Sequence, residues 1–123
     1  MQALTKAEEQ VMVILWQLEK GFVKEVLAQF PEPKPAYNTV STIIRILETK
    51  GFISHEEMGK SHRYFPLVSK KDYSSFSLKE IMERYFAGSP SRLLSFFARE
   101  EDMNTEDLEK LVEELKQQEG GQS

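Results

Sequence analysis

The stretch AYNTVSTIIRILETKG, residues 36–51, carries the pattern that decides the fold of this chain. Its apolar residues recur at spacings of three and four, which predicts a helix over about residues 37–50 with one buried stripe. That stripe comprises Val40, Ile43, Ile44 and Leu47. Gly51 suits the end of the helix, because glycine adopts the left-handed conformation that often follows a last helical turn.

Two further helices are expected before this stretch. Thr5 followed three residues later by Glu8 is the pattern of a capping box, which opens a helix that Gly21 is expected to cap at its other end. A short helix fits Val23–Phe30, and the three prolines of residues 31–35 stop it. The segment up to residue 50 therefore predicts three helices in succession.

A hairpin is expected after the third helix. Two short runs, Phe52–Met58 and His62–Leu67, flank a turn that contains Gly59. The apolar anchors expected for this hairpin are Tyr64, Phe65 and Leu67. Three helices and a hairpin are typical of a winged helix-turn-helix, so residues 1–68 predict a winged-helix DNA-binding domain, and the fold class is mainly α with a small β-hairpin wing.

Residues 69–123 predict helices alone, over about Lys70–Phe86, Ser91–Arg99 and 105–116, with a polar tail from Gln117. These helices are too few to form a core of their own, so their apolar stripes pack either on the first domain or on a second copy of the chain. We expect a helical dimerisation domain and a homodimer. The residues predicted at the dimer contact are Tyr85, Leu93, Leu94, Phe97, Leu108, Leu111, Val112 and Leu115.

The net charge of −4 is unevenly distributed over the 123 residues. Residues 1–68 carry 8 basic and 8 acidic side chains, whereas residues 69–123 carry 8 basic and 12 acidic ones. The excess acid therefore belongs to the second half, and a neutral first half remains compatible with a nucleic-acid partner.

The polar front of the third helix is suited to reading DNA. Arg45 has the shape for a bidentate contact with guanine, and the cationic tip of the hairpin suits phosphate contacts. The predicted partner is a double-stranded DNA operator, and the predicted contact residues are Tyr37, Asn38, Thr39, Ser41, Thr42, Arg45, Lys60, His62 and Arg63. The alternative is an ordinary solvated face, on which Arg45 pairs with Glu48 one turn further along.

Other chemistries find little support in the sequence. The absence of cysteine excludes disulfides, thiolate metal sites and cysteine nucleophiles, and no phosphate-binding loop or His-Glu-x-x-His motif is present. We interpret His55 and His62 as surface or packing residues rather than metal ligands, and expect no enzyme activity, cofactor or metal. Without a long apolar run, we expect a cytoplasmic protein with no membrane partner.

Several short motifs occur together along this chain. They are Leu4-Thr5-Lys6-Ala7-Glu8, Val11-Met12, Leu15-Trp16, Ala36-Tyr37-Asn38-Thr39-Val40, Thr42-Ile43, Arg45-Ile46-Leu47, Lys50-Gly51-Phe52-Ile53, Arg63-Tyr64-Phe65-Pro66 and Leu93-Leu94-Ser95-Phe96-Phe97. With this set, the chain resembles the penicillinase-repressor family of bacteria, which controls β-lactamase and methicillin-resistance genes. The resemblance extends over about residues 4–116.

The resemblance implies a dimeric transcriptional repressor of a pseudo-palindromic operator, with Tyr37 to Arg45 in the recognition helix. It also implies relief by a regulatory protease that cuts the C-terminal half at an Asn-Phe step; here the matching position is Phe96-Phe97, without the Asn. The C-terminal cysteines of the family's copper-responsive branch are absent, which excludes that chemistry. A winged-helix module that binds proteins instead of DNA is the alternative function.

Overall fold

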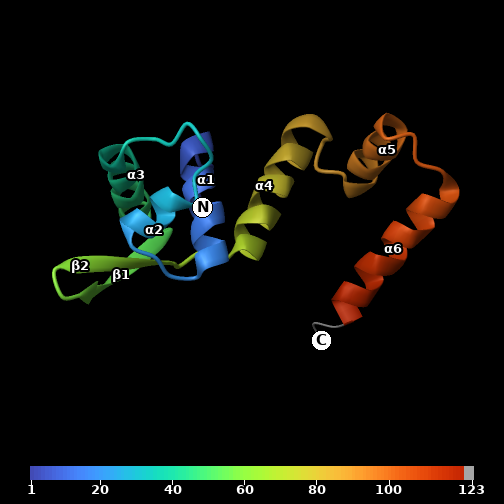
Figure 1. Ribbon diagram of the computed structural model, residues 1–123. Coiled ribbons are helices and arrows are strands. Elements are labelled where there is room, and N and C mark those ends of the chain that lie inside the picture. The colour runs from blue at the N-terminus through green and yellow to red at the C-terminus, as the bar shows by residue number, and fades with distance from the viewer. Residues whose placement is uncertain (121–123) are drawn as a thin grey trace. The chain divides into compact units, whose positions relative to one another are not determined.

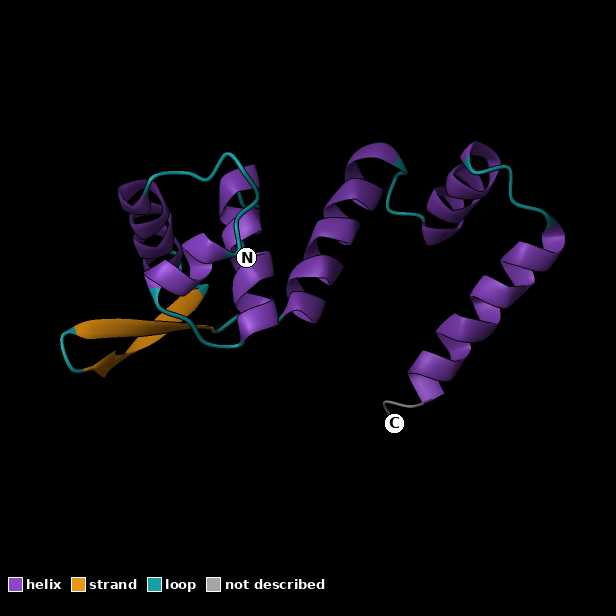
Figure 2. Ribbon diagram, viewed as in Figure 1, coloured by secondary structure: helices purple, strands orange, loops and turns teal. Residues whose placement is uncertain are grey.

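The computed structural model describes residues 1–120, apart from the side chains of residues 115, 116 and 118–120. Its elements are α1 (Lys6–Leu18), α2 (Val23–Ala28), α3 (Tyr37–Thr49), β1 (Ile53–Met58), β2 (Ser61–Pro66), α4 (Lys70–Tyr85), α5 (Pro90–Glu100) and α6 (Thr105–Gly120). Three helices and a hairpin are followed by three more helices, and the order of these elements can be followed in Figures 1 and 2. The predicted fold class, mainly α with a small hairpin wing, is confirmed. No helix among the described residues is long and apolar enough to cross a membrane.

The capping box predicted at the start of α1 is present. The Glu8 backbone N–H donates to Thr5 Oγ1 at 3.2 Å, and the Thr5 N–H donates to Glu8 Oε1 at 2.8 Å. At the other end of α1, the prediction that Gly21 is the cap was wrong, because Glu19 takes that position with a φ of 69°. Gly21 instead exchanges two backbone hydrogen bonds with Tyr64 of β2, at 2.8 and 2.9 Å, and so joins the α1–α2 loop to the wing.

The predicted stripe of α3 faces the core of the first unit. Val40, Ile44 and Leu47 are fully buried there and Ile43 is partly buried. Gly51 ends the helix with a φ of +81°, as expected. The other core residues come from α1, α2, the wing, α4 and the loops next to them, and they are Leu4, Val11, Met12, Ile14, Leu15, Val23, Val26, Phe30, Phe52, Ile53, Tyr64 and Tyr73. This core holds α3 by its apolar back and leaves its polar front in solvent.

The wing is a two-stranded antiparallel sheet in which Ile53 lies opposite Pro66 and Met58 lies opposite Ser61. Of the three predicted anchors, Tyr64 is buried and Phe65 is partly buried. Leu67 was wrongly predicted as an anchor, since it lies just beyond β2 and is 58% exposed.

The chain divides into two compact units, Met1–Ser77 and Leu78–Ser123, and the division falls within α4. Residues after the wing belong to the first unit because they bond to α1 and its N-terminal flank. The Leu4 N–H donates to the Tyr73 hydroxyl at 2.9 Å, and Trp16 Nε1 donates to the Val68 carbonyl at 2.9 Å. The first turns of α4 thus close the core of the winged-helix unit.

The second unit contains little buried apolar surface. Ala98 is the one apolar residue that is buried among its described residues. Ser89 caps α5 by accepting from the Arg92 N–H at 3.2 Å, and Asn104 caps α6 by accepting from the Asp107 N–H at 2.8 Å. The prediction of a polar tail from Gln117 was wrong for residues 117–120, because α6 continues to Gly120. The remaining part of the predicted tail, residues 121–123, lies outside the described residues.

Candidate nucleic-acid interface

A hollow of about 580 Å³ lies between the start of α2, the front of α3 and the tip of the wing. Five of the nine predicted contact residues line it, namely Tyr37, Ser41, Arg45, Lys60 and His62. The other lining residues are Phe22, Val23, Lys24, Glu25, Ser61 and Tyr64. Asn38, Thr39 and Thr42 are exposed on α3 outside the hollow. The fold therefore gathers the polar front of α3 and the wing tip around one concave surface.

Arg45 is the cation at the centre of the α3 front. Its side chain is exposed, and no carboxylate of the described residues lies within salt-bridge distance of it. The pair that we considered between Arg45 and Glu48 is absent, because the Glu48 carboxylate instead accepts from His55 Nδ1 at 2.5 Å. The Arg45 guanidinium therefore keeps its donors available for a ligand.

Thr42, also on α3, has one restriction as a contact residue. Its hydroxyl donates to the Asn38 carbonyl at 2.8 Å, within the same helix. The hydroxyl proton is therefore already used, and Thr42 is left to accept a hydrogen bond or to offer its methyl group to a thymine.

The predicted contact residues His62 and Arg63 lie on opposite faces of the wing. Neighbouring residues of a strand point to opposite faces, and His62 lines the hollow whereas Arg63 does not. Arg63 lies opposite Glu56 in the register and is partly buried. Lys60, at the tip, is exposed and lines the hollow.

Lys24 is a lining residue that the sequence analysis missed. It lies in the first turn of α2, and its exposed ammonium adds a third cation to the hollow beside Arg45 and Lys60. The one carboxylate that lines the hollow is that of Glu25, which accepts from the Phe22 N–H at 2.9 Å. Lys24 could have been predicted from a general property of the helix-turn-helix. The first of its two helices, here α2, crosses the DNA backbone, so cations on it are candidates for phosphate contacts.

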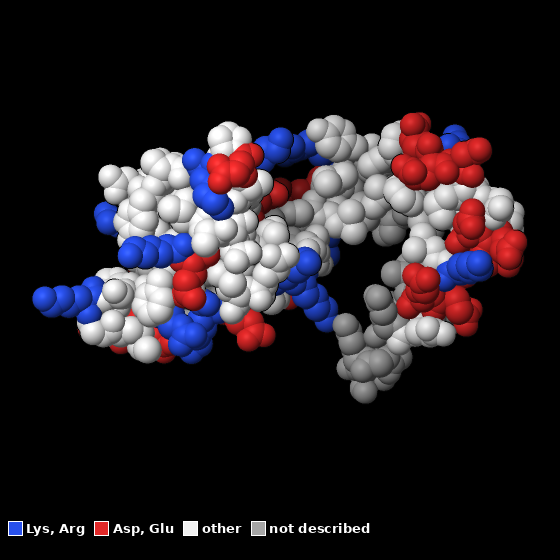
Figure 3. All heavy atoms as spheres, viewed as in Figure 1, with Lys and Arg blue, Asp and Glu red and all other residues white. Residues whose placement is uncertain are grey.

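The two units differ in their surface charges. Figure 3 shows Lys and Arg side chains at the tip of the hairpin, and mainly Asp and Glu side chains around the end of α5 and the start of α6. The first 68 residues are neutral overall, but the hollow is lined by three cations, Lys24, Arg45 and Lys60, against one carboxylate, and is therefore locally basic.

A partly buried ion pair fixes the C-terminal end of α3 to α1. Lys50 Nζ donates to both carboxylate oxygens of Glu8, at 2.8 and 3.0 Å, and the Glu8 side chain is only 6% exposed. Burial alone would raise the pKa of the Glu8 carboxyl, but the hydrogen bonds from Lys50 and Thr5 outweigh it and hold the pKa below its ordinary value. This pair orients α3 from the side opposite its polar front.

Tyr64 of the wing lies in the core, where charges of Glu48 and Arg45 of α3 act on its phenol. Burial, together with the nearby Glu48 carboxylate, raises the pKa of the Tyr64 phenol above its ordinary value, against the opposing effect of Arg45. Tyr64 is therefore a neutral packing residue at physiological pH, as its place in the core requires.

The residues predicted for the dimer contact and for cleavage lie in the second unit. Tyr85, Phe96, Phe97 and Val112 are exposed there, with Tyr85 reaching 69%. Leu93, Leu94, Leu108 and Leu111 are partly buried, and the side chain of Leu115 lies outside the described residues. Phe96 and Phe97 lie in the middle of α5.

Comparison of the sequence with known proteins points to one family. The family model described as "Penicillinase repressor" matches residues 4–117. The methicillin resistance regulatory protein MecI of Staphylococcus aureus (strain N315) is 26% identical over 109 residues, which cover 88% of this chain and 89% of MecI. The penicillinase repressor of Bacillus licheniformis is 21% identical over 115 residues, which cover 93% and 90%.

A solved structure, "CopR Repressor Structure", covers 55% of this chain and 100% of its own, with 33% identity and a TM-score of 0.47. The family match spans both units of this protein, from the capped start of α1 into α6. The chain therefore belongs to the penicillinase repressor family of transcriptional repressors.

Proposed function

We propose that this repressor acts as a homodimer that binds a pseudo-palindromic DNA operator, with one winged-helix unit on each half-site. The observation that carries the proposal is the hollow itself, which Arg45 of α3 lines together with the cations Lys24 and Lys60, and Arg45 pairs with no carboxylate of the described residues. A helix with short polar side chains and one arginine fits the major groove, and cations at its margins fit the flanking phosphates.

The roles divide between base reading and phosphate contact. Arg45 reads a guanine, Asn38 pairs with an adenine, and Lys24 and Lys60 contact the backbone. With two phosphate contacts per protomer, the logarithm of the affinity of the dimer falls with the logarithm of salt concentration at a slope of about −3.6.

The dimer is supported by the apolar surface of the second unit. Leu78, Ile81, Tyr85, Phe96, Phe97 and Val112 are all exposed in the single chain. Helices with such faces bury them against a partner, and a two-fold dimer places two α3 helices on half-sites one helical turn or a multiple apart. Sedimentation at micromolar concentration tests this part, and a monomer mass there would contradict it.

A salt titration of DNA binding tests the main proposal. Duplexes from the region upstream of the chain's own gene are titrated by fluorescence anisotropy between about 50 and 200 mM salt, the range over which phosphate-dominated binding weakens strongly. We expect a linear logarithmic loss of affinity. Binding that is absent or insensitive to salt would contradict the proposal.

A protein–protein module is the second candidate, because Arg45 is the only cation on α3. That function predicts a hollow that binds a partner protein and no salt-dependent affinity for any duplex. The same titration therefore separates the two candidates.

Relief by a regulatory protease is the final part of the proposal. Phe96 and Phe97 are exposed, but they lie in a helix, so cleavage there requires α5 to open locally. Mass spectrometry of the chain recovered from induced cells tests this step. A cut between Phe96 and Phe97 supports it, and an intact chain in derepressed cells contradicts it.

A further inference from the structure

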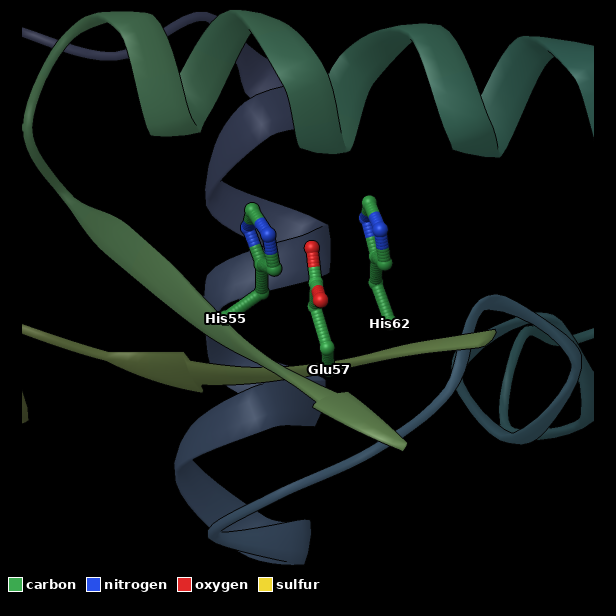
Figure 4. A group of neighbouring side chains, drawn as sticks. All are labelled: His55, Glu57 and His62. Carbon is green, nitrogen blue, oxygen red and sulfur yellow. The ribbon is translucent and has the colours of Figure 1, made fainter. Parts of the chain in front are cut away.

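Three side chains that bind transition metals well lie together on one face of the wing. Glu57 of β1 lies directly opposite His62 of β2, and His55 shares their face because it lies two residues before Glu57 on the same strand. The ligand atoms of the three side chains all lie within 4.8 Å of one another. Figure 4 shows all three on the side of the hairpin that faces α3.

A fourth residue orients His55. Glu48 of α3 holds His55 Nδ1 at 2.5 Å from its carboxylate oxygen Oε2. An ionised carboxylate only accepts hydrogen bonds, so Nδ1 carries a proton, and in the neutral imidazole the lone pair of Nε2 is then available to a metal. A histidine that donates one N–H to a carboxylate while it offers the other nitrogen is the usual arrangement around a bound metal.

The chemistry of the donors indicates which ion fits. Two imidazoles and one carboxylate favour zinc and its neighbours in the transition series over calcium or magnesium, which prefer oxygen ligands. At bond lengths of about 2.0–2.1 Å, the ligand atoms of a tetrahedral ion lie about 3.4 Å apart. Glu57 and His62 are exposed, so rotation of their side chains can close the present spacing.

We propose that His55, Glu57 and His62 bind one divalent ion of the zinc class, with Glu48 positioning His55 and water at the fourth place. The two imidazoles are now stacked, with ring centroids 4.1 Å apart and planes 7° apart. Because a metal lies in the plane of each imidazole that binds it, the ion separates this stack as it binds. The proposal does not depend on DNA binding, and its test contains no DNA.

The experiment titrates the tag-free full-length chain with Zn²⁺ by calorimetry, with Mg²⁺ as the comparison ion. We expect one Zn²⁺ per chain and no Mg²⁺ binding. Glu57→Gln is the main variant, since this side chain is exposed and has no hydrogen-bond partner among the described residues, and Glu56→Gln is its matched control. Glu56 is the next residue on the strand, but its carboxylate lies on the other face, 3.1 Å from Lys20 Nζ.

The variants have a predicted order. Glu48→Gln keeps all three ligands and lowers Zn²⁺ affinity about 10- to 100-fold, the usual effect of removing an outer partner. Glu57→Gln and His62→Gln lower it further, and Glu56→Gln leaves it unchanged. Zinc binding that is absent, or that falls equally in Glu56→Gln and Glu57→Gln, would overturn the proposal.

A second measurement uses the fact that the chain has only two histidines. One equivalent of paramagnetic Co²⁺ is expected to shift the ring-proton NMR signals of both. A shift of neither or of only one would overturn the assignment of two imidazole ligands.

Discussion

Arg45→Ala is expected to change DNA recognition while leaving stability almost unchanged. The side chain is exposed and without a carboxylate partner among the described residues, and α3 is held by apolar contacts on its other side. Alanine also favours helix. We therefore expect the free energy of unfolding to change by less than about 0.5 kcal/mol.

The loss of binding follows from the contact proposed for Arg45. A bidentate contact to guanine contributes about 1–3 kcal/mol of discrimination, which is about 5- to 150-fold per half-site. Two identical half-sites on one dimer double the free energy. Affinity for the operator should therefore fall by about 2–6 kcal/mol, whereas affinity for unrelated DNA loses only the contribution of one charge per protomer.

The assay compares the dissociation constants of an operator duplex and of a duplex with the contacted guanine replaced. Wild-type protein should discriminate between them, and Arg45→Ala should not. Arg92→Ala, an exposed arginine of α5, removes the same charge and serves as the control. If Arg45→Ala weakens both duplexes by the same factor, Arg45 contacts phosphate, and the proposed base reading is wrong.

Three other changes test the account. Lys60→Ala should weaken binding to every duplex alike. In anisotropy titrations at several salt concentrations, the slope of log affinity against log salt should become less steep by about one unit for each phosphate that the lysine neutralises. An unchanged slope would show that Lys60 contacts no phosphate. Because the pKa of Glu8 is lowered in the folded state, its stabilising effect is complete above its ordinary pKa of 4.5 and is lost as the pH falls through the folded-state pKa. Thermal melts below pH 4.5 should therefore show a steeper loss for wild type than for Glu8→Gln, and parallel curves would contradict this. Phe97→Ser should shift the sedimentation equilibrium toward monomer with an unchanged winged-helix unit, whereas an unchanged dimer would exclude Phe97 from the contact.

Much of the winged-helix unit could be predicted from local sequence. Three features depend on residues only a few positions apart, and all three are present in the structure. They are the buried stripe of α3, the capping box formed by Thr5 and Glu8, and the glycine after α3. Gly21 was misassigned because its role depends on a bridge to Tyr64, which lies 43 residues further along the chain. Such a contact leaves no periodic signal.

In the candidate sites, too, features set by nearby residues could be predicted and features set by distant residues could not. Arg45 and Lys60 were recognised from their place on a helix front and a turn, and both line the hollow. The partner of Glu48 could not be predicted in the same way. The i to i+3 spacing along α3 favours Arg45 as the partner, whereas the folded hairpin brings His55 nearer to Glu48. The histidine cluster likewise depends on strand register, which places His62 opposite Glu57.

The proposed binding mode of the dimer can be measured by selection of bound duplexes from a random DNA library. A dimer with one α3 in each major groove should enrich an inverted repeat whose half-sites are centred about 10–10.5 base pairs apart or a multiple of that spacing. Arg45→Ala should abolish the enrichment at one position in each half-site. Recovery of duplexes with no common sequence, or of a single half-site without its inverted copy, would contradict the account.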